Sequence, residues 1–499
     1  MRLRAPDHGR PLRAMQDAVD RELAAARTGG GRAAFGVDAT RVARGPGGFL
    51  YRVDPPPEAT LVEDSPAWLT VGERAFDGRL GSVADESCLV EVAEDLGPRV
   101  LDGRLVVDNL GPLRGLRQRL TALEGEQPRP PTFRFDQAEF VLGTPGGRLN
   151  DAMAEAASSA EEWRYDDRIG DLLRSALRQR WARVHTPPGT DANGLIARLL
   201  DRLLALDARV LFVAPAGAVV DRTVGALCDR LARSGRLRSG MVQRIGPLAP
   251  GAVRDRWGPF VEPATIAADL RAGVDARLSD LDRAEGRMRY DELDRIAGSA
   301  ERGAADLDTE LERRVGARRG RRDRDIDPDT LVVRRHELRG RSRDARRDAD
   351  RIASELAADD RPVPTVEDVV GPGGGPSDQR RRLVAARREL VAARGDVDPA
   401  LRSRLRLAAA TTRGAYLRGL PRADYGVVVI AGPTLAPEAY YLAGLSTRSV
   451  ISVGSAGADP GPRPAPRAEP HVELPPRRHS GPGRSQGPHP VDPQGGPTS

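Results

Sequence analysis

Apolar and polar positions alternate in short segments through the first part of the chain. Between residues 47 and 120 the segments read FLYRV, ATLVE, AWLTVG, SCLVEVA and RVLDGRLVVD, separated by Pro, Gly and Asp. A period of two points alternate side chains of a strand toward one core. We therefore predict a small β-rich, barrel-like domain over residues 46–125. Residues 1–45 are polar and Arg-rich, with helix formers around Ala14–Ala26, and they predict an N-terminal helical segment.

From Trp163 onward, apolar runs alternate with amphipathic stretches of helical period. The runs are ARVHT, RVLFVAP (209–215), MVQRIG (241–246), YGVVVIAG (425–432) and RSVISVGS (448–455). The stretches that predict helices are Ile169–Arg180, Leu195–Leu206, Ala218–Ser234, Gln379–Arg394 and Ala400–Ala410. Strands that alternate with helices in this way indicate a parallel sheet with crossover connections. The predicted fold class is therefore α/β, with one sheet formed by residues 163–260 and 379–458.

Residues 261–378 interrupt this alternation. Charge is dense there and leucines recur at helical spacing, which predicts a charged helical, coiled-coil-like insertion. Two segments within it are rich in arginine, RRVGARRGRRDRD (313–325) and RRHELRGRSRDARR (334–347). They fit either a solvated face of mixed-sign pairs or a surface that contacts nucleic-acid phosphates. On the second reading, the candidate nucleic-acid-binding residues are Arg318, Arg319, Arg321 and Arg322.

Composition adds expectations for the rest of the chain. Residues 126–162 include the Pro-rich GEQPRPPT and are predicted to be a linker. Residues 459–499 contain Pro, Gly, Arg and His with almost no apolar side chains, which predicts a disordered tail. The histidines of the tail are scattered, so we expect no metal site.

Targeting and redox signals are weak. The chain has two cysteines, Cys88 and Cys228, too few for a disulfide framework. It has no long charge-free apolar stretch, and its first residues have no apolar signal region. We therefore expect a reduced, cytoplasmic protein with no membrane partner.

The segment HTPPGTDANG (185–194) lies between a predicted strand and a predicted helix, where nucleotide-binding proteins hold phosphate. A phosphate-binding loop reads G-x-x-x-x-G-K-S/T. All 78 basic residues of this chain are arginine, so no position can supply the lysine of that motif. The net charge of +6 is small for 499 residues and does not by itself indicate a nucleic-acid partner.

The order and character of these strands resemble the first RecA-like AAA domain of superfamily 1 helicases, the group that includes the nonsense-decay and flap-processing helicases. The matches span residues 163–260 and 381–460, and the predicted barrel and insertion resemble that family's accessory barrel and stalk more weakly. The matching residues are Pro187, Pro188, Gly189 and Thr190 of the loop, Ala214, Pro215, Val220 and Asp221 after the next strand, Ala410, Thr411 and Thr412, then Val427–Ile430, and finally Val453, Gly454 and Pro460. The resemblance implies a RecA-like P-loop NTPase fold, with ATP and magnesium as the cofactors expected for the family.

The departures from the family pattern remove its chemistry. The degenerate P-loop positions, beginning at Thr186, place Asp191 at a loop glycine, Ala192 at the lysine and Asn193 at the magnesium-ligating hydroxyl. The Walker B positions, which hold Asp and Glu in the family, are Ala431 and Gly432. In motif III, Gly454 is kept, but the γ-phosphate-sensing glutamine is replaced by Ala458.

Because phosphoryl transfer depends on positioning and on the metal, these replacements predict a pseudo-helicase that needs no cofactor. It would bind DNA, RNA or a protein partner without ATP hydrolysis. One alternative is an ATP-dependent helicase subunit whose partner supplies a second RecA-like domain. Another is a structural adaptor or a decayed fragment.

Overall fold

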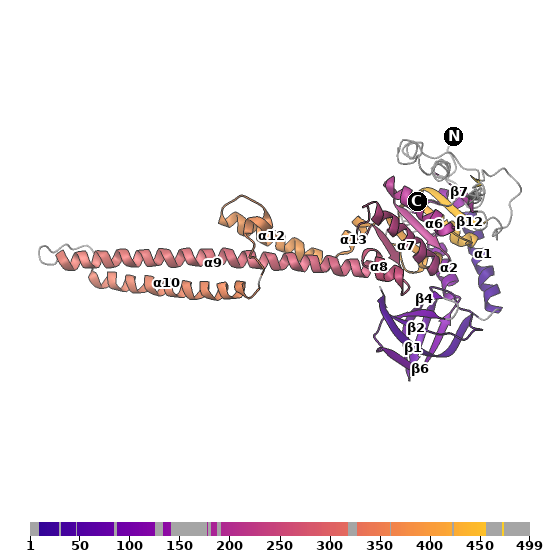
Figure 1. Cartoon of the computed structure of the whole chain (residues 1–499), viewed down its shortest axis with the longest axis horizontal. Coiled ribbons are helices and arrows are strands. Elements are labelled where there is room, and N and C mark those ends of the chain that lie inside the picture. The colour runs from indigo at the N-terminus through magenta and orange to yellow at the C-terminus, as the bar shows by residue number, and fades with distance from the viewer. Residues whose placement is uncertain are drawn as a thin grey trace, which may run out of the picture. The chain divides into compact units, whose positions relative to one another are not determined.

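The computed structural model describes residues 9–28, 31–45, 47–83, 87–124, 133–140, 177, 181–186, 191–317, 327–359, 361–421, 424–455 and 472–473. They fall into two compact units (Figure 1). The first unit comprises Met1–Pro263 and Leu405–Ser499, and the second, which we call the helical unit, comprises Ala264–Arg404. None of the described helices combines the length and apolar character that crossing a membrane requires.

Six antiparallel strands of the first unit form the predicted barrel, which is closed in the order β1-β2-β5-β4-β3-β6. Their bounds are β1 Arg32–Gly45, β2 Gly48–Val53, β3 Pro66–Val71, β4 Arg74–Val83, β5 Cys88–Val92 and β6 Arg99–Asp108. The predicted segment ATLVE (59–63) is not a strand, and β4 was not predicted. Alternate side chains of these strands, among them Tyr51, Leu69 and Leu105, are fully buried in the barrel core.

The predicted boundary between the N-terminal helical segment and the barrel is wrong. Helix α1 (Gly9–Thr28) ends before β1, so residues 32–45 are a strand and not part of a helical segment. The reason is the alternation Ala33, Phe35, Val37, Ala39, which pairs with β6 and turns Val37 and Ala39 into the core.

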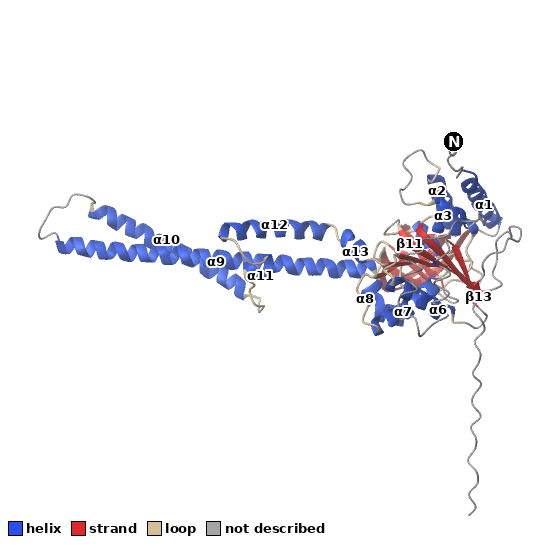
Figure 2. Ribbon diagram, turned by 90° about the horizontal axis from the view of Figure 1, so that it is seen from above, coloured by secondary structure: helices blue, strands red, loops and turns tan. Residues whose placement is uncertain are grey.

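The α/β part contains a parallel sheet with the order β13-β7-β12-β11-β8-β10-β9 (Figure 2). Its strands are β7 Trp181–Thr186, β8 Val210–Ala214, β9 Val242–Ile245, β10 Leu407–Thr411, β11 Tyr425–Ala431, β12 Ser446–Ser455 and β13 Val472–Glu473. Strands β8, β10 and β11 consist almost wholly of buried apolar residues, as expected of strands covered on both faces. The α/β class and the parallel sheet are thus confirmed.

Helices cover both faces of the sheet. One face packs on α6 (Ala192–Ala205), α7 (Gly217–Arg233) and α8 (Ala252–Val261). The other face packs on α14 (Thr412–Leu417) and α15 (Ala436–Ala443). A further layer of α1, α2 (Gly111–Ala122) and α3 (Phe135–Phe140) closes over the side chains of Tyr416 and Tyr440.

The structure differs from three predictions made from the sequence. The predicted helix 400–410 is wrong beyond α13 (Asp398–Arg404), because LAAAT forms β10 and hydrogen-bonds to β8 and β9 on its two sides. Strand pairing here overrides the helix propensity of alanine. Helix α3 lies in the predicted linker 126–162, and β13 lies in the predicted disordered tail and pairs with β7. The other residues of that tail, and the predicted helix 169–180 apart from Leu177, lie outside the described residues.

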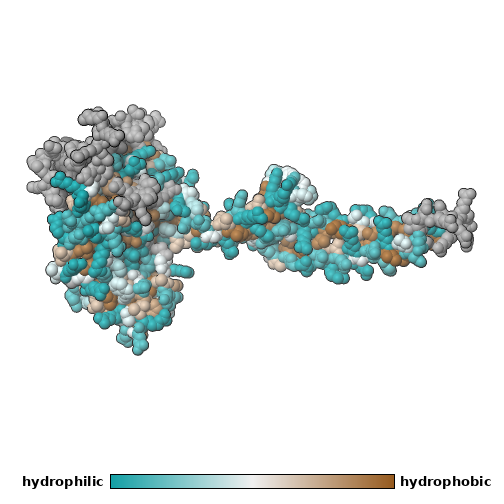
Figure 3. Space-filling view, turned by 180° about the vertical axis from the view of Figure 1, so that it is seen from behind, coloured by the Kyte–Doolittle hydropathy of each residue, from teal (hydrophilic) through white to brown (hydrophobic). Residues whose placement is uncertain are grey.

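The helical unit contains α9 (Pro263–Ala317), α10 (Pro328–Ala357), α11 (Val366–Val370), α12 (Pro376–Gly395) and α13. Figure 1 shows α10 and α12 lying along α9. The predicted insertion ended at residue 378, but the unit runs to Arg404, because Leu383 of α12 packs on Leu281 of α9 and Leu401 of α13 packs on Ile266. On the face drawn in Figure 3 its surface is mainly hydrophilic, with separate apolar patches.

Candidate functional site

The carboxyl ends of the parallel strands meet at one edge of the sheet, which is where open α/β sheets bind ligands. Two predicted site positions come together there. The Thr186 hydroxyl, at the end of β7, donates a hydrogen bond to the Gly454 carbonyl oxygen of β12 over 3.2 Å. Residues Pro187, Pro188, Gly189, Thr190 and Ala458 lie outside the described residues.

Asp191 occupies the start of α6. Its carboxylate caps the helix by accepting a hydrogen bond from the Gly194 backbone N–H, with 3.0 Å between the oxygen and the nitrogen. The first backbone N–H groups of a helix are the donors that hold phosphate in nucleotide sites. Here one of them is already bonded to a carboxylate of the same chain, whose negative charge opposes a phosphate at this helix start.

The next two positions of the expected phosphate loop, Ala192 and Asn193, supply no cationic side chain. Ala192 has no polar side chain, and the Asn193 side-chain oxygen accepts a hydrogen bond of 3.4 Å from the Thr223 hydroxyl of α7. Among the described residues, no group of His, Cys, Asp or Glu side chains is arranged to hold a metal ion.

The two positions expected to match Walker B, Ala431 and Gly432, lie at the end of β11 and carry no carboxylate. The backbone N–H of Gly432 donates to the Val453 carbonyl oxygen over 2.8 Å, which continues the pairing with β12. Gly432 has a φ of 79°, and a Cβ at this position would lie 3.3 Å from the ring of Pro215. The turn after β11 therefore favours glycine on conformational grounds.

Asp221, one of the residues that match the helicase pattern, forms a buried ion pair within the protein. Its carboxylate pairs with the Arg244 guanidinium of β9 over 2.7 Å, and both side chains are buried. The other carboxylate oxygen accepts the backbone N–H of Ala249 over 3.0 Å. This ion pair joins α7 to the end of β9.

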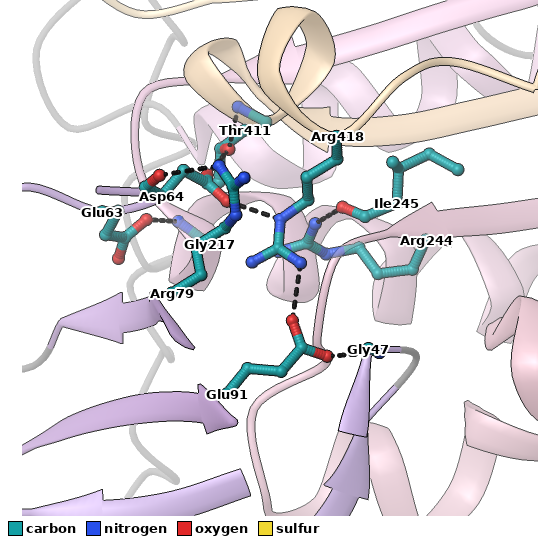
Figure 4. Close-up of polar contacts among 11 residues, drawn as sticks. Gly47, Glu63, Asp64, Arg79, Glu91, Gly217, Arg244, Ile245, Thr411 and Arg418 are labelled. Atoms are coloured by element: carbon teal, nitrogen blue, oxygen red, sulfur yellow. Dashed lines mark hydrogen bonds and ion pairs between the residues drawn. The ribbon is translucent and has the colours of Figure 1, made fainter. Parts of the chain in front are cut away.

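A carboxylate pair that the sequence gave no reason to select lies between the barrel and this edge of the sheet (Figure 4). Glu63 and Asp64 precede β3, and both are buried. Glu63 accepts the backbone N–H of Gly217, at the start of α7, over 2.6 Å and that of Val83 over 2.9 Å. Burial raises the pKa of Glu63, although the two backbone hydrogen bonds lower it. Glu63, which precedes β3 of the barrel, thus caps the N-terminus of α7.

Asp64 contacts the neighbouring helix start. Its carboxylate accepts hydrogen bonds from the Thr411 hydroxyl and from Arg418 Nε, the latter over 2.6 Å. Thr411 in turn caps α14, since its oxygen accepts the Gly414 backbone N–H over 2.8 Å. Asp64 has a φ of 63°, in the left-handed region that Asp tolerates better than most residues. Through its side-chain hydrogen bonds, Asp64 joins the segment before β3 to the start of α14 and to Arg418, just after that helix.

Arg418 completes the junction (Figure 4). Its Nη1 donates to Glu91 of β5 over 2.7 Å, and the other Glu91 oxygen accepts the Gly47 backbone N–H over 2.7 Å. Beside this network lies an open groove of about 540 Å³, whose lining includes Arg79, Arg244, Arg418 and Glu91. The groove is formed by barrel and sheet residues of one unit, and its guanidinium groups are largely engaged by carboxylates or carbonyl oxygens.

The two arginine-rich segments of the helical unit differ in how much of them the structure describes. Arg318, Arg319, Arg321 and Arg322 lie outside the described residues. In the second segment, Arg335 and Arg339 both pair with Asp308 of α9, and Arg346 pairs with Glu301. These contacts agree with mixed-sign pairing for that segment.

No protein-family model matches this chain, and no curated protein is significantly similar to it.

Proposed function

We propose that this chain is a helicase-like protein of RecA-like P-loop NTPase fold that binds nucleic acid or a protein partner without hydrolysing ATP. The RecA-like assignment is part of the proposal. It is supported by the phosphate-loop-like segment between β7 and α6, and by the parallel sheet, in which the matching residues Ala214, Thr411 and Gly454 lie at the ends of β8, β10 and β12.

The observation that carries the proposal is the closure of three helix starts along the carboxyl edge of the sheet. The N-terminus of α6 is capped by Asp191, that of α7 by Glu63, and that of α14 by Thr411. A nucleotide phosphate needs such N–H groups unoccupied, together with a cation. A charge-assisted contact to phosphate contributes about 1.5–3 kcal/mol, and two of these caps are carboxylates that oppose it.

Hydrolysis has a second requirement that the site does not supply. Phosphoryl transfer uses a carboxylate-held magnesium ion and a residue that positions the attacking water. The end of β11 carries Ala431 and Gly432 in those positions, and the turn there favours glycine. These residues argue against turnover.

The binding half of the proposal is tested with nucleic acid. Labelled single-stranded DNA and RNA are titrated with the full chain across about 50–200 mM salt, followed by fluorescence anisotropy. We expect the logarithm of the affinity to fall linearly with the logarithm of the salt concentration, because phosphate contacts release counterions. Replacing Arg318, Arg319, Arg321 and Arg322 by Gln should flatten that slope and weaken all sequences alike.

A matched variant controls for net charge. Arg10, Arg13, Arg21 and Arg27 are exposed on α1, and their replacement by Gln removes the same charge elsewhere. If both quadruple variants bind as the wild type does, the four arginines of the insertion do not contact the strand. If the wild type binds no nucleic acid at low salt, the nucleic-acid role is wrong and only the partner-binding role remains.

A further inference from the structure

Helix α12 lies antiparallel to α9 and is held by arginines at every seventh position. Arg380 pairs with Glu292 over 3.0 Å, Arg387 with Asp282 and Glu285, and Arg394 with Asp275 over 2.7 Å. Leu383 is buried beneath these pairs against Leu281 and Ala284 of α9. One face of α12 is therefore fully used in packing on α9.

A second face of α12 has no covering element in the described part of the chain. It carries Arg381, Val384, Arg388 and Val391, which recur at the spacing of one helical stripe. Val384 is 48% exposed and Val391 is 55% exposed. Two apolar side chains, each with an arginine three residues before it, are thus exposed to solvent within eight residues.

The stripe borders a groove of about 560 Å³ between α9 and α12. Its apolar lining comes from Met288, Pro376, Val384 and Ala385. Its charged lining consists of four arginines, Arg295, Arg380, Arg381 and Arg388, and one carboxylate, Glu292.

The charges of this lining do not balance. Glu292 is engaged by Arg380, and Arg381 pairs with Asp378 in its own helix. Arg295 and Arg388 have no ion pair with any carboxylate of the described residues. The lining of the groove therefore combines apolar side chains with two guanidinium groups that have no ion pair within the described residues.

This combination distinguishes between classes of ligand. Single-stranded nucleic acid is held by aromatic side chains on which bases stack, and the residues that line the groove include none. A helix laid in a groove instead presents apolar side chains at helical spacing, and Met288 suits such a contact because methionine adapts to irregular surfaces. The excess of arginine selects carboxylates on that helix through charge complementarity.

We propose that the groove between α9 and α12 binds an acidic amphipathic helix of a partner protein. Apolar side chains of the partner pack on Met288 and Val384, and its Asp or Glu side chains pair with Arg295 and Arg388. The proposal goes beyond the proposed function, since it rests on the helical unit alone and uses none of the strand-end residues.

The test uses the full chain and a designed peptide. The probe is a fluorescent helix with Leu at i, i+3, i+4 and i+7 and Glu at its remaining positions. Its comparators are a scrambled peptide of the same composition and a single-stranded oligonucleotide of equal charge. We expect the amphipathic peptide to bind and the scrambled peptide to bind at least about tenfold more weakly, because only the first presents one apolar stripe.

The variant Val384→Glu/Arg388→Glu should weaken binding of the peptide by about tenfold or more, because it sets carboxylates against those of the peptide. Arg295→Glu, which changes a lining residue of α9, is a second variant with the same expected direction. Val333→Glu changes a valine that is 57% exposed on α10 and should bind as the wild type does. Circular dichroism of each variant should match the wild type, since all the changed side chains are exposed.

Three results would overturn the proposal. They are equal binding of the scrambled and amphipathic peptides, unchanged peptide affinity in both groove variants, and loss of oligonucleotide binding but not peptide binding in those variants. The last result would assign the groove to nucleic acid. None of them bears on ATP hydrolysis, so this proposal and the proposed absence of turnover fail independently.

Discussion

Replacing Arg418 by Met should cause a large loss of stability in the first unit. Its guanidinium lies 2.6 Å from Asp64 and 2.7 Å from Glu91, and the three side chains are 12%, 4% and 5% exposed. Methionine fills similar volume but leaves two buried carboxylates without their cation. Removing one partner of a buried ion pair costs about 3–5 kcal/mol, because the other charge stays buried and uncompensated. We therefore expect the free energy of unfolding to fall by about 3–5 kcal/mol.

Urea denaturation followed by circular dichroism measures this loss. Arg209→Met is the matched control, because Arg209 and Asp424 form a pair of 3.1 Å whose side chains are 41% and 50% exposed. Such a surface pair contributes about 0–1 kcal/mol. Arg418→Lys should fall between the two, since one ammonium cannot bridge both carboxylates as a guanidinium does. If Arg418→Met costs no more than Arg209→Met, the network does not fasten the barrel to the sheet.

Three further predictions address burial and backbone conformation. Burial raises the pKa of Glu438 above its ordinary 4.5, so the folded chain keeps that proton longer than the unfolded chain. Calorimetry should then show that the stability of the wild type relative to Glu438→Gln falls as the pH rises above about 4.5. A stability difference between the two proteins that does not change with pH would refute this. Gly48→Ala should cost at least about 2 kcal/mol in urea denaturation, because Gly48 has a φ of 147° and a Cβ would collide with the Val92 carbonyl. Gly36→Ala should stay within about 0.5 kcal/mol, since the nearest atom lies 3.9 Å away, and equal losses would refute the steric argument. Burial also raises the pKa of Cys88 and Cys228 to about 12, so Ellman's reagent should modify neither thiol before unfolding, and rapid labelling of the native chain would contradict their burial.

The hydrophobic pattern predicted much of the fold, but it missed strands β1, β4, β10 and β13, and its segment ATLVE (59–63) is not a strand. Apolar runs such as 425–432 are specific for a buried parallel strand and were confirmed. Strand β1 was missed because arginines interrupt its alternation after Ala39. Strand β10 was missed because three of its five residues are alanine, whose helix propensity is overridden by pairing on both sides.

The candidate site was predicted in part. The residues at the strand ends follow from local spacing, so Thr186 and Gly454 could be expected at one edge. The Glu63–Asp64 pair could not, because its partners Gly217 and Arg418 are 154 and 354 residues away along the chain. Nothing in the local sequence VEDSP distinguishes a buried carboxylate pair from an ordinary turn.

The most direct test of the account is titration of the full chain with ATP and Mg²⁺ by isothermal calorimetry, combined with a phosphate-release assay with and without single-stranded nucleic acid. The account predicts no binding heat at near-millimolar nucleotide and no phosphate release above the buffer rate, because it assigns Asp191, Ala431 and Gly432 to the phosphate and metal positions of the proposed fold. Micromolar binding of ATP, or release of phosphate that depends on the protein, would contradict it.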